Sequence, residues 1–96
     1  MLVLISYDVS TSDTAGRKRL RQVARVCQNY GQRVQNSVFE CQLDSTQLRM
    51  VEAMLEKLID RDTDSLRFYV IGAAYTGKVK HVGARPSFDV TDPLIL

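Results

Sequence analysis

The sequence predicts an α+β protein of the ferredoxin-like type, a βαββαβ sandwich in which two helices cover one face of an antiparallel sheet and a further strand lies near the C-terminus. Apolar, strand-like runs alternate with two segments of helical periodicity. The segment between the helices has a polar centre that would divide it into two strands. No repeat, linker or low-complexity segment interrupts the 96 residues. Residues 1–96 are therefore expected to form a single domain.

The first strand is predicted over residues 2–8, where an apolar run ends in Asp8 and a polar loop follows over 10–16. The first helix is predicted over 17–29, because apolar residues recur at spacings of three and four residues. These residues are Leu20, Val23, Ala24 and Cys27. Gly31 is a suitable stop for this helix.

The segment 33–42 alternates in the manner of extended chain, and its polar centre predicts a bend between two short strands. Asp44 or Ser45 is predicted to cap the second helix, with Gln47 completing a capping box from Asp44. The buried stripe of this helix is expected to contain Leu48, Val51, Leu55, Leu58 and Ile59.

The C-terminal part is predicted to hold a charged turn over 60–64, a strand over 65–72 and a short strand over 79–82. With both helices on one face, the other sheet face needs cover. Tyr7, Phe68, Tyr69 and the apolar tail are the material expected for it. A homodimer through the sheet faces is therefore expected, with the tail over 84–96 taking part.

The charge of the chain is unevenly distributed. The formal net charge is +2, yet residues 1–39 carry +4 and residues 40–96 carry −2. Three arginines at four-residue spacing, Arg17, Arg21 and Arg25, lie on one side of the first predicted helix. Such a basic patch is typical of proteins that bind a polyanion, although a merely solvated helix face gives the same pattern.

Several other classes of site are not favoured. Cys27 and Cys41 have neither disulfide nor zinc-site spacing and are expected to be buried thiols. The stretch GAAYTG lacks the ending of a phosphate-binding P-loop. The single histidine, His81, has no nucleophile at a suitable spacing and is expected on the surface. The chain has no basic region before its first apolar run and no apolar run of spanning length, so a cytoplasmic protein without a membrane partner is expected.

Four stretches in this order and spacing, YDV, RKRLRQV, GQRVQNSVFEC and DSLRFYVIG, resemble the small CRISPR-associated protein two family over nearly the whole chain. The resemblance implies a ferredoxin-like homodimer that takes part in acquiring new spacers. It further implies a metal-dependent endonuclease acting on RNA or double-stranded DNA. It also implies a place in the spacer-integration complex beside the larger CRISPR integrase subunit, a role for which the nuclease activity is not needed.

The resemblance assigns a metal and catalytic role to Asp8, which would meet its twin across the dimer and bind Mg²⁺ or another divalent metal. Two such carboxylates repel each other, and a hard cation relieves that repulsion. The residues alone favour a simpler role for Asp8, the capping of the following loop. Tyr7 precedes the aspartate as in the family and is a second catalytic candidate.

The candidate nucleic-acid-binding residues are Arg17, Arg19, Arg21, Arg25 and Arg33. Arginine side chains suit phosphate groups and developing negative charge. Arg33 and Phe39 match the arginine and phenylalanine that flank a Gln-x-Ser-Val stretch in the family, and Ser37 is the serine of that stretch. Ser37 and Phe39 are less direct candidates, and packing is the preferred role for Phe39.

Other functions remain open at the level of sequence. The same surface would serve a non-catalytic DNA-binding scaffold of the integration complex. A ribonuclease toxin of related fold and a small-molecule-sensing ferredoxin-like dimer are further alternatives. The residues do not distinguish RNA from DNA as the substrate.

Overall fold

The computed structural model describes residues 1–71 and 78–84, with side chains left out for residues 78 and 79. In this part of the chain the elements are β1 (Leu2–Asp8), α1 (Thr14–Tyr30), β2 (Gly31–Gln35), β3 (Val38–Gln42), α2 (Ser45–Leu58), β4 (Ser65–Ile71) and β5 (Lys78–Gly83). The first six have the βαββαβ order predicted from the sequence. The fifth strand is the additional C-terminal strand.

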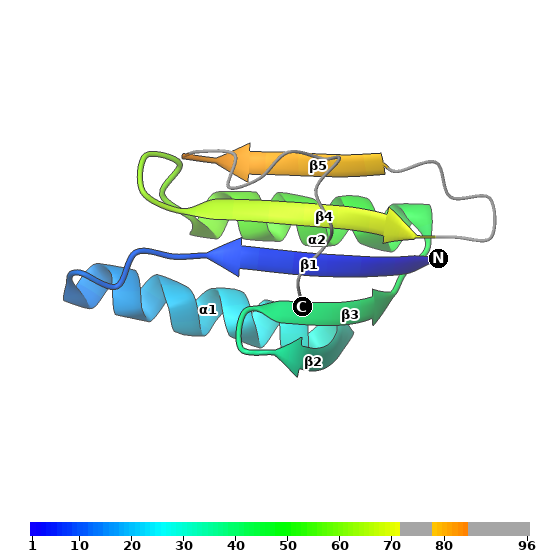
Figure 1. The fold of residues 1–96 in the computed structure, drawn as a ribbon, viewed down its shortest axis with the longest axis horizontal. Helices are drawn as coiled ribbons and strands as arrows, with labels where there is room; N and C mark the ends of the chain where they lie inside the picture. The colour runs from blue at the N-terminus through cyan, green and yellow to red at the C-terminus, as the bar shows by residue number, and fades with distance from the viewer. Residues whose placement is uncertain (72–77, 85–96) are drawn as a thin grey trace.

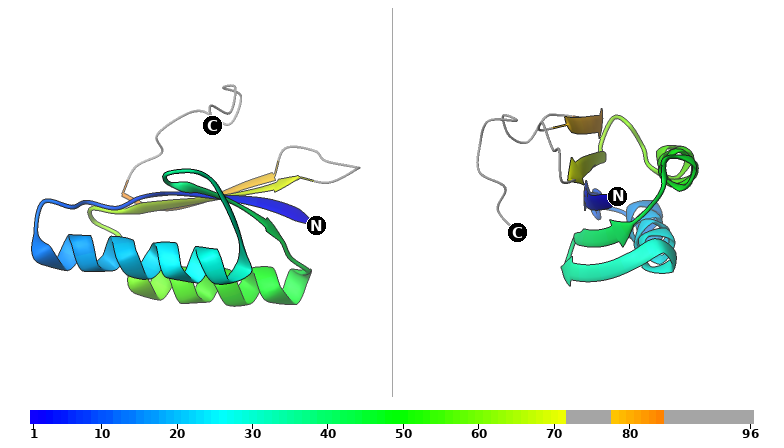
Figure 2. Two further views of the ribbon diagram at one scale, coloured as in Figure 1. Left: turned by 90° about the horizontal axis from the view of Figure 1, so that it is seen from below. Right: turned by 90° about the vertical axis from the view of Figure 1, so that its right-hand side faces the viewer.

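The strands form one antiparallel sheet in the order β2-β3-β1-β4-β5 (Figure 1). Both helices lie on the same face of this sheet, as the views along its edges show (Figure 2). The predicted ferredoxin-like α+β fold is thereby confirmed. Strand β1 is central, so its end is flanked by other elements rather than open at a sheet edge.

The hydrophobic core lies between the sheet and the two helices. Alternate residues of β1, including Ile5 and Tyr7, pack against Val23 and Cys27 of α1 and against Leu55 of α2. Successive residues of a strand point to opposite faces, so the other half of β1 faces away from the helices.

The register corrects one prediction about the sheet face opposite the helices. Ile5 pairs with Phe68, and Leu4 pairs with Tyr69. Phe68 and Tyr7 therefore belong to the core, and of the three predicted aromatic residues Tyr69 alone lies on the opposite face. The alternation of β4 and its pairing with β1 decide this.

Helix α1 begins earlier than its hydrophobic pattern predicted. Its first residue is Thr14, and the side chain of Asp13 caps it by accepting a hydrogen bond from the Gly16 N–H at 2.7 Å. The predicted start at residue 17 was wrong, because the first turn is set by this cap and not by an apolar stripe.

The segment between the helices divides as predicted. A turn at residues 36–37 separates β2 from β3, and their pairing contains an irregularity between Arg33 and Gln35. Strand β2 starts two residues earlier than predicted, at Gly31, directly after α1. A Cβ on Gly31 would overlap the Cys41 sulfur and the Glu40 carbonyl, so the change from helix to strand uses the small size of glycine.

The structure assigns the cap of α2 to Asp44. Its carboxylate accepts a hydrogen bond from the Gln47 N–H at 2.7 Å, and the Gln47 side chain accepts one from the Asp44 N–H at 3.0 Å. This is the predicted capping box, and Ser45 is the first residue of the helix rather than its cap.

The two cysteines are buried and free, as expected. Burial raises the pKa of the Cys27 thiol to about 12 and that of the Cys41 thiol to about 11, so both stay protonated at neutral pH. Residues 85–96 lie outside the described residues, and the predicted participation of the tail in dimer contacts stays a prediction.

Replacement of the cap tests the assignment of the α2 N-terminus. Asp44→Ala removes an acceptor for an otherwise unpaired helix N–H and should lower the free energy of unfolding by about 1 kcal/mol. Ser45→Ala is the matched control and should change it by less than about 0.5 kcal/mol. Urea denaturation measures both. Equal losses would contradict the assignment.

Candidate functional site

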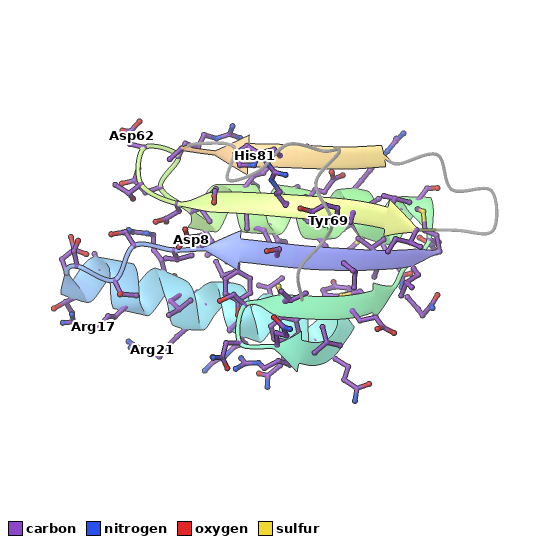
Figure 3. The ribbon with its side chains drawn as sticks, in the orientation of Figure 1. Asp8, Arg17, Arg21, Asp62, Tyr69 and His81 are labelled. Atoms are coloured by element: carbon purple, nitrogen blue, oxygen red, sulfur yellow. The ribbon has the colours of Figure 1, made fainter. Side chains whose placement is uncertain are left out.

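Asp8 is the last residue of β1, and its side chain is exposed. It lies at one end of the sheet, the end where Asp62 is also found in the loop between α2 and β4 (Figure 3). A hollow of about 540 Å³ opens here, and its lining is Asp8, Ser10, Asp62, Thr63 and Ala84. The structure therefore places the predicted metal ligand in an open hollow that solvent reaches.

Tyr7 does not share this surface. Its side chain is buried in the core, and its hydroxyl donates to the Asn36 carbonyl at 3.3 Å. Burial, together with the nearby Cys27 thiol, raises the Tyr7 pKa. Neighbouring residues of a strand point to opposite faces, so the structure separates the two residues that the sequence had combined as catalytic candidates.

Phe39 is a core residue, which confirms the packing role preferred for it. It is fully buried, and its ring stacks on that of Tyr7 with centroids 6.2 Å apart. The guanidinium of Arg33 lies 5.1 Å from the Phe39 centroid, a cation–π contact from the exposed edge strand. Ser37 contributes its backbone carbonyl, which accepts from the Tyr7 N–H at 3.0 Å. These residues connect β1 to the β2–β3 turn.

The predicted basic face is present on α1. Arg17, Arg21 and Arg25 are exposed, and Figure 3 shows Arg17 and Arg21 along the helix. A shallow hollow of about 230 Å³ is lined by Lys18, Arg21, Gln22 and Arg25. Arg17 bonds only locally among described residues, to Thr11 and Thr14, which leaves this cation in contact with solvent.

Arg19 differs from the other arginines of this helix. Its Nε donates to the Asp64 carboxylate at 2.8 Å, and 20% of its side chain is exposed while none of the Asp64 side chain is. The predicted charged turn over 60–64 is present, with the Asp64 N–H donating to the Asp60 carbonyl at 2.7 Å, but the burial of the Asp64 side chain was not predicted from the sequence. Arg19 lies four residues before Val23 and eight before Cys27, on the apolar side of α1. An arginine at that position required a buried acidic partner, and this is the signal by which Asp64 could have been found.

The Asp64 carboxylate is surrounded by donors. One oxygen accepts from Arg19 and from the Asp60 N–H, at 2.8 and 2.9 Å. The other accepts from the Ser10 N–H at 2.9 Å and from the Thr63 hydroxyl at 3.1 Å. Burial by itself raises the Asp64 pKa, but these hydrogen bonds outweigh it and hold the pKa below its usual value. Asp64 is therefore a buried anion at neutral pH.

His81 is half-buried on β5 rather than on the open surface. Its Nδ1 accepts from the Arg67 Nε at 3.0 Å, and burial, followed by the charge of Arg67, lowers the His81 pKa. Its Nε2 is buried, with no hydrogen-bond partner among the described residues. Arg67 and Tyr69 lie beside it on the sheet face opposite the helices, away from the core. His81 is thus a neutral acceptor for an arginine.

The residues at Asp8 fit a divalent metal in kind. The residues that line the hollow are Asp8, Ser10, Asp62, Thr63 and Ala84, and the polar atoms of their side chains are all oxygens, which Mg²⁺ prefers. Within residues 1–71 and 78–84 there is no group of three or more His, Cys, Asp or Glu that could hold a metal. Mg²⁺ uses one or two protein carboxylates and keeps several waters, so a site built on Asp8 needs little more from this chain.

Comparisons with known proteins identify a family for this chain. The family model described as CRISPR associated protein Cas2 matches residues 1–79. A protein of Halalkalibacterium halodurans named CRISPR-associated endonuclease Cas2 is 63% identical over 95 residues, which cover 99% of each chain. A Nitratidesulfovibrio vulgaris protein named CRISPR-associated endoribonuclease Cas2 is 54% identical over 96 residues, covering 100% of this chain and 94% of that protein.

Solved structures lead to the same family. The crystal structure of Streptococcus pyogenes Cas2 at pH 6.5 superposes with a TM-score of 0.71 at 53% sequence identity, covering 77% of this chain and 89% of that one. No helix in the described part of the chain has the length and apolar character needed to cross a membrane.

Asp64 makes stability depend on pH. Its folded-state pKa is lowered, so its contribution is complete above the unfolded value of about 3.9 and is lost as pH falls through the folded value. Asp64→Asn should lower the free energy of unfolding by about 3 kcal/mol at pH 7, and the difference from the parent should shrink below about pH 4. Denaturation at several pH values measures this.

Asp62→Asn is the matched control, since it removes the same charge from an exposed position in the same loop. It should change the free energy of unfolding by less than about 0.5 kcal/mol at all pH values. A loss for Asp64→Asn that stayed constant down to pH 2 would show that charge pairing is not its cause.

Proposed function

Because the chain belongs to the CRISPR associated protein Cas2 family, we propose that it is a homodimeric endonuclease of spacer acquisition, acting on RNA or double-stranded DNA with Mg²⁺ or a similar metal held by Asp8 of both chains. The observation that carries this proposal is the exposed Asp8 carboxylate at the mouth of an oxygen-lined hollow. The names of the relatives, endonuclease and endoribonuclease, support hydrolysis of a phosphodiester.

Asp8, the exposed arginines of α1 and Tyr7 have different roles in the proposed reaction. A divalent metal, when bound, supplies polarisation of a phosphoryl oxygen and an activated water. Asp8 holds and orients that ion from the end of a central strand. The exposed arginines of α1 bind phosphates on either side of the scissile group and position the strand. Tyr7 acts from the core, where its packing on Phe39 keeps the end of β1 in place.

Two copies of the chain supply what one copy lacks. A single described chain offers no cluster of three potential ligands, and Asp8 is the exposed carboxylate at the end of β1. A twofold axis near Asp8 would bring a second carboxylate to the same ion, the number that Mg²⁺ commonly takes from protein. The homodimer is therefore part of the proposed site.

A second function, a DNA-gripping scaffold beside the larger integrase subunit, has an observation of its own. The basic face of α1 lies on an exposed helix and needs no chemistry at Asp8 to hold a nucleic-acid backbone. Both functions use the same phosphate contacts, and they differ only in whether Asp8 is required.

Asp8→Asn separates enzyme from scaffold, since it keeps the size and removes the charge. Cleavage in Mg²⁺ should fall by about 100-fold or more, because the metal-held charge stabilisation is lost. Affinity for nucleic acid should stay the same or rise, because a negative group near the phosphates is gone. Cleavage of labelled RNA and duplex DNA, with affinity measured in parallel, tests this. Glu52→Gln is the charge-matched control and should retain the parental rate.

Cleavage by Asp8→Asn at the parental rate, after repeated purification, would refute the metal-nuclease proposal and leave the scaffold. The scaffold is then tested by spacer integration with the same variant. Integration at the parental level would support it, and a loss of integration would assign Asp8 a role in the complex itself.

The basic face of α1 is tested by salt dependence. Arg17→Ala with Arg21→Ala should reduce the slope of log affinity against log salt by roughly two units, if each residue contacts one phosphate. The control is Arg49→Ala with Arg61→Ala, which removes one exposed arginine in α2 and one in the loop that follows it. This pair of substitutions should leave the slope unchanged. Equal reductions in both pairs would mean that only net charge matters. Arg19 is unsuitable for this test, because its replacement also removes the partner of Asp64.

A further inference from the structure

The buried Asp64 side chain receives hydrogen bonds from parts of the chain that are distant in sequence. Ser10 follows β1, Arg19 belongs to α1, and Asp60 follows the end of α2. Asp64 itself immediately precedes β4. One carboxylate thus joins the segments that meet at the end of the sheet where Asp8 lies.

Ser10, two residues beyond Asp8, is fixed from both sides. Its N–H donates to the Asp64 carboxylate at 2.9 Å. Its carbonyl lies so close to α1 that a Cβ on Gly16 would overlap the oxygen. The Ser10 N–H therefore has a hydrogen-bond partner and its carbonyl packs closely against Gly16, so the path of the chain after Asp8 depends on Asp64 and Gly16.

The backbone of Asp64 holds the other side of the same region. Its carbonyl accepts from the Ala84 N–H at 2.9 Å. The chain reaches this point through Gly83, whose φ of 121° suits glycine and whose Cβ, if present, would overlap the Asp64 carbonyl. Asp8 pairs with Ser65, and Ser65 pairs with Gly83, so this contact continues the sheet at Asp8.

The hollow at Asp8 is lined by residues that these contacts hold in place. Ser10 and Ala84 donate directly to Asp64, and Thr63 donates through its hydroxyl. A buried ion pair is costly to desolvate, and apolar packing often stabilises a fold equally well. A charged carboxylate offers something different here, since two oxygens accept four donors at once and orient them. These four hydrogen bonds indicate that the role of the Asp64 carboxylate is to orient the segment that follows Asp8.

We propose that Asp64, with Arg19 as its partner, is a positioning residue that holds Asp8 and the walls of its hollow in the geometry that binds a divalent metal. The inference deepens the proposed function and rests on it for the identity of the ligand. Asp64 itself touches neither metal nor substrate, and it acts through its hydrogen bonds with Ser10 and Thr63.

Asp64→Asn is the main variant. In asparagine an NH2 group, which donates, replaces one of the two carboxylate oxygens. In one orientation this NH2 group faces the Arg19 and Asp60 donors, and in the other it faces the Ser10 N–H. Either orientation breaks one side of the network. Val51→Ala, in the core of α2 away from Asp8, is the control for lost stability alone, and both variants are compared in the folded state.

Metal binding is read from the broadening of the Val9 and Ser10 amide signals by Mn²⁺, with Asp8→Asn defining the background. Asp64→Asn should weaken Mn²⁺ binding about tenfold or more, as the loss of a supporting contact behind a ligand does. In cleavage assays kcat should fall while KM for the nucleic acid stays unchanged. Val51→Ala should stay within about twofold of the parent in both measurements. Equal changes in Asp64→Asn and Val51→Ala would overturn the proposal.

Arg19→Gln is the second variant, for use if Asp64→Asn does not fold. It leaves Asp64 with its other three donors and should weaken Mn²⁺ binding, measured without nucleic acid, by about threefold or more. Unchanged Mn²⁺ affinity in this variant would remove Arg19 from the positioning role and, with a non-folding Asp64→Asn, overturn the proposal.

Hydrogen exchange of the Ser10 amide distinguishes failure of this inference from failure of the proposed function. It requires neither metal nor cleavage. If the parent shows no Mn²⁺ effect that depends on Asp8, the metal-nuclease proposal fails, and exchange alone decides on positioning. Ser10 should then exchange about tenfold faster in Asp64→Asn than in Val51→Ala, because its acceptor is disturbed. Equal exchange would refute the positioning of this segment.

Discussion

A carboxylate without exposure to solvent has to be surrounded by hydrogen-bond donors, and in this protein that requirement falls on Asp64. The donors come from the segment after β1, from α1 and from the loop after α2. In an interior of low dielectric, a shift of any one segment would leave a charged oxygen without a donor. The end of the sheet that carries Asp8 is therefore built around a residue that does not itself face the hollow.

Helix α1 shows how one periodicity serves three purposes. Val23 and Cys27 bury the apolar side against the sheet. Arg19 lies on that same side and reaches the buried anion. Arg17 and Arg21 lie on the outer side, where they are exposed and accessible to a phosphate backbone. The helix thus combines core, internal ion pair and outer charge, and a count of basic residues alone does not separate the last two.

Adjacent residues at the end of β1 have opposite surroundings. Tyr7 is buried and bonded to the β2–β3 turn, whereas Asp8 is exposed in the hollow. The alternation of a strand produces this contrast. It places an aromatic side chain packed in the core next to an exposed carboxylate, an arrangement that suits both the proposed metal-dependent nuclease and the proposed nucleic-acid scaffold.

The sequence by itself determined the order of elements, the division of the segment between the helices, the Asp44 capping box and the basic side of α1, because each of these follows from local periodicity or a local hydrogen bond. Only the tertiary structure decided that Phe68 faces the core, that Tyr7 and Asp8 are separated, and that Asp64 is buried. These features depend on strand register and on contacts between residues tens of positions apart, such as the 45 between Arg19 and Asp64. A cluster of aspartates in the sequence predicts side chains exposed to solvent. The packing of α1 against the loop before β4 buries one of them, Asp64.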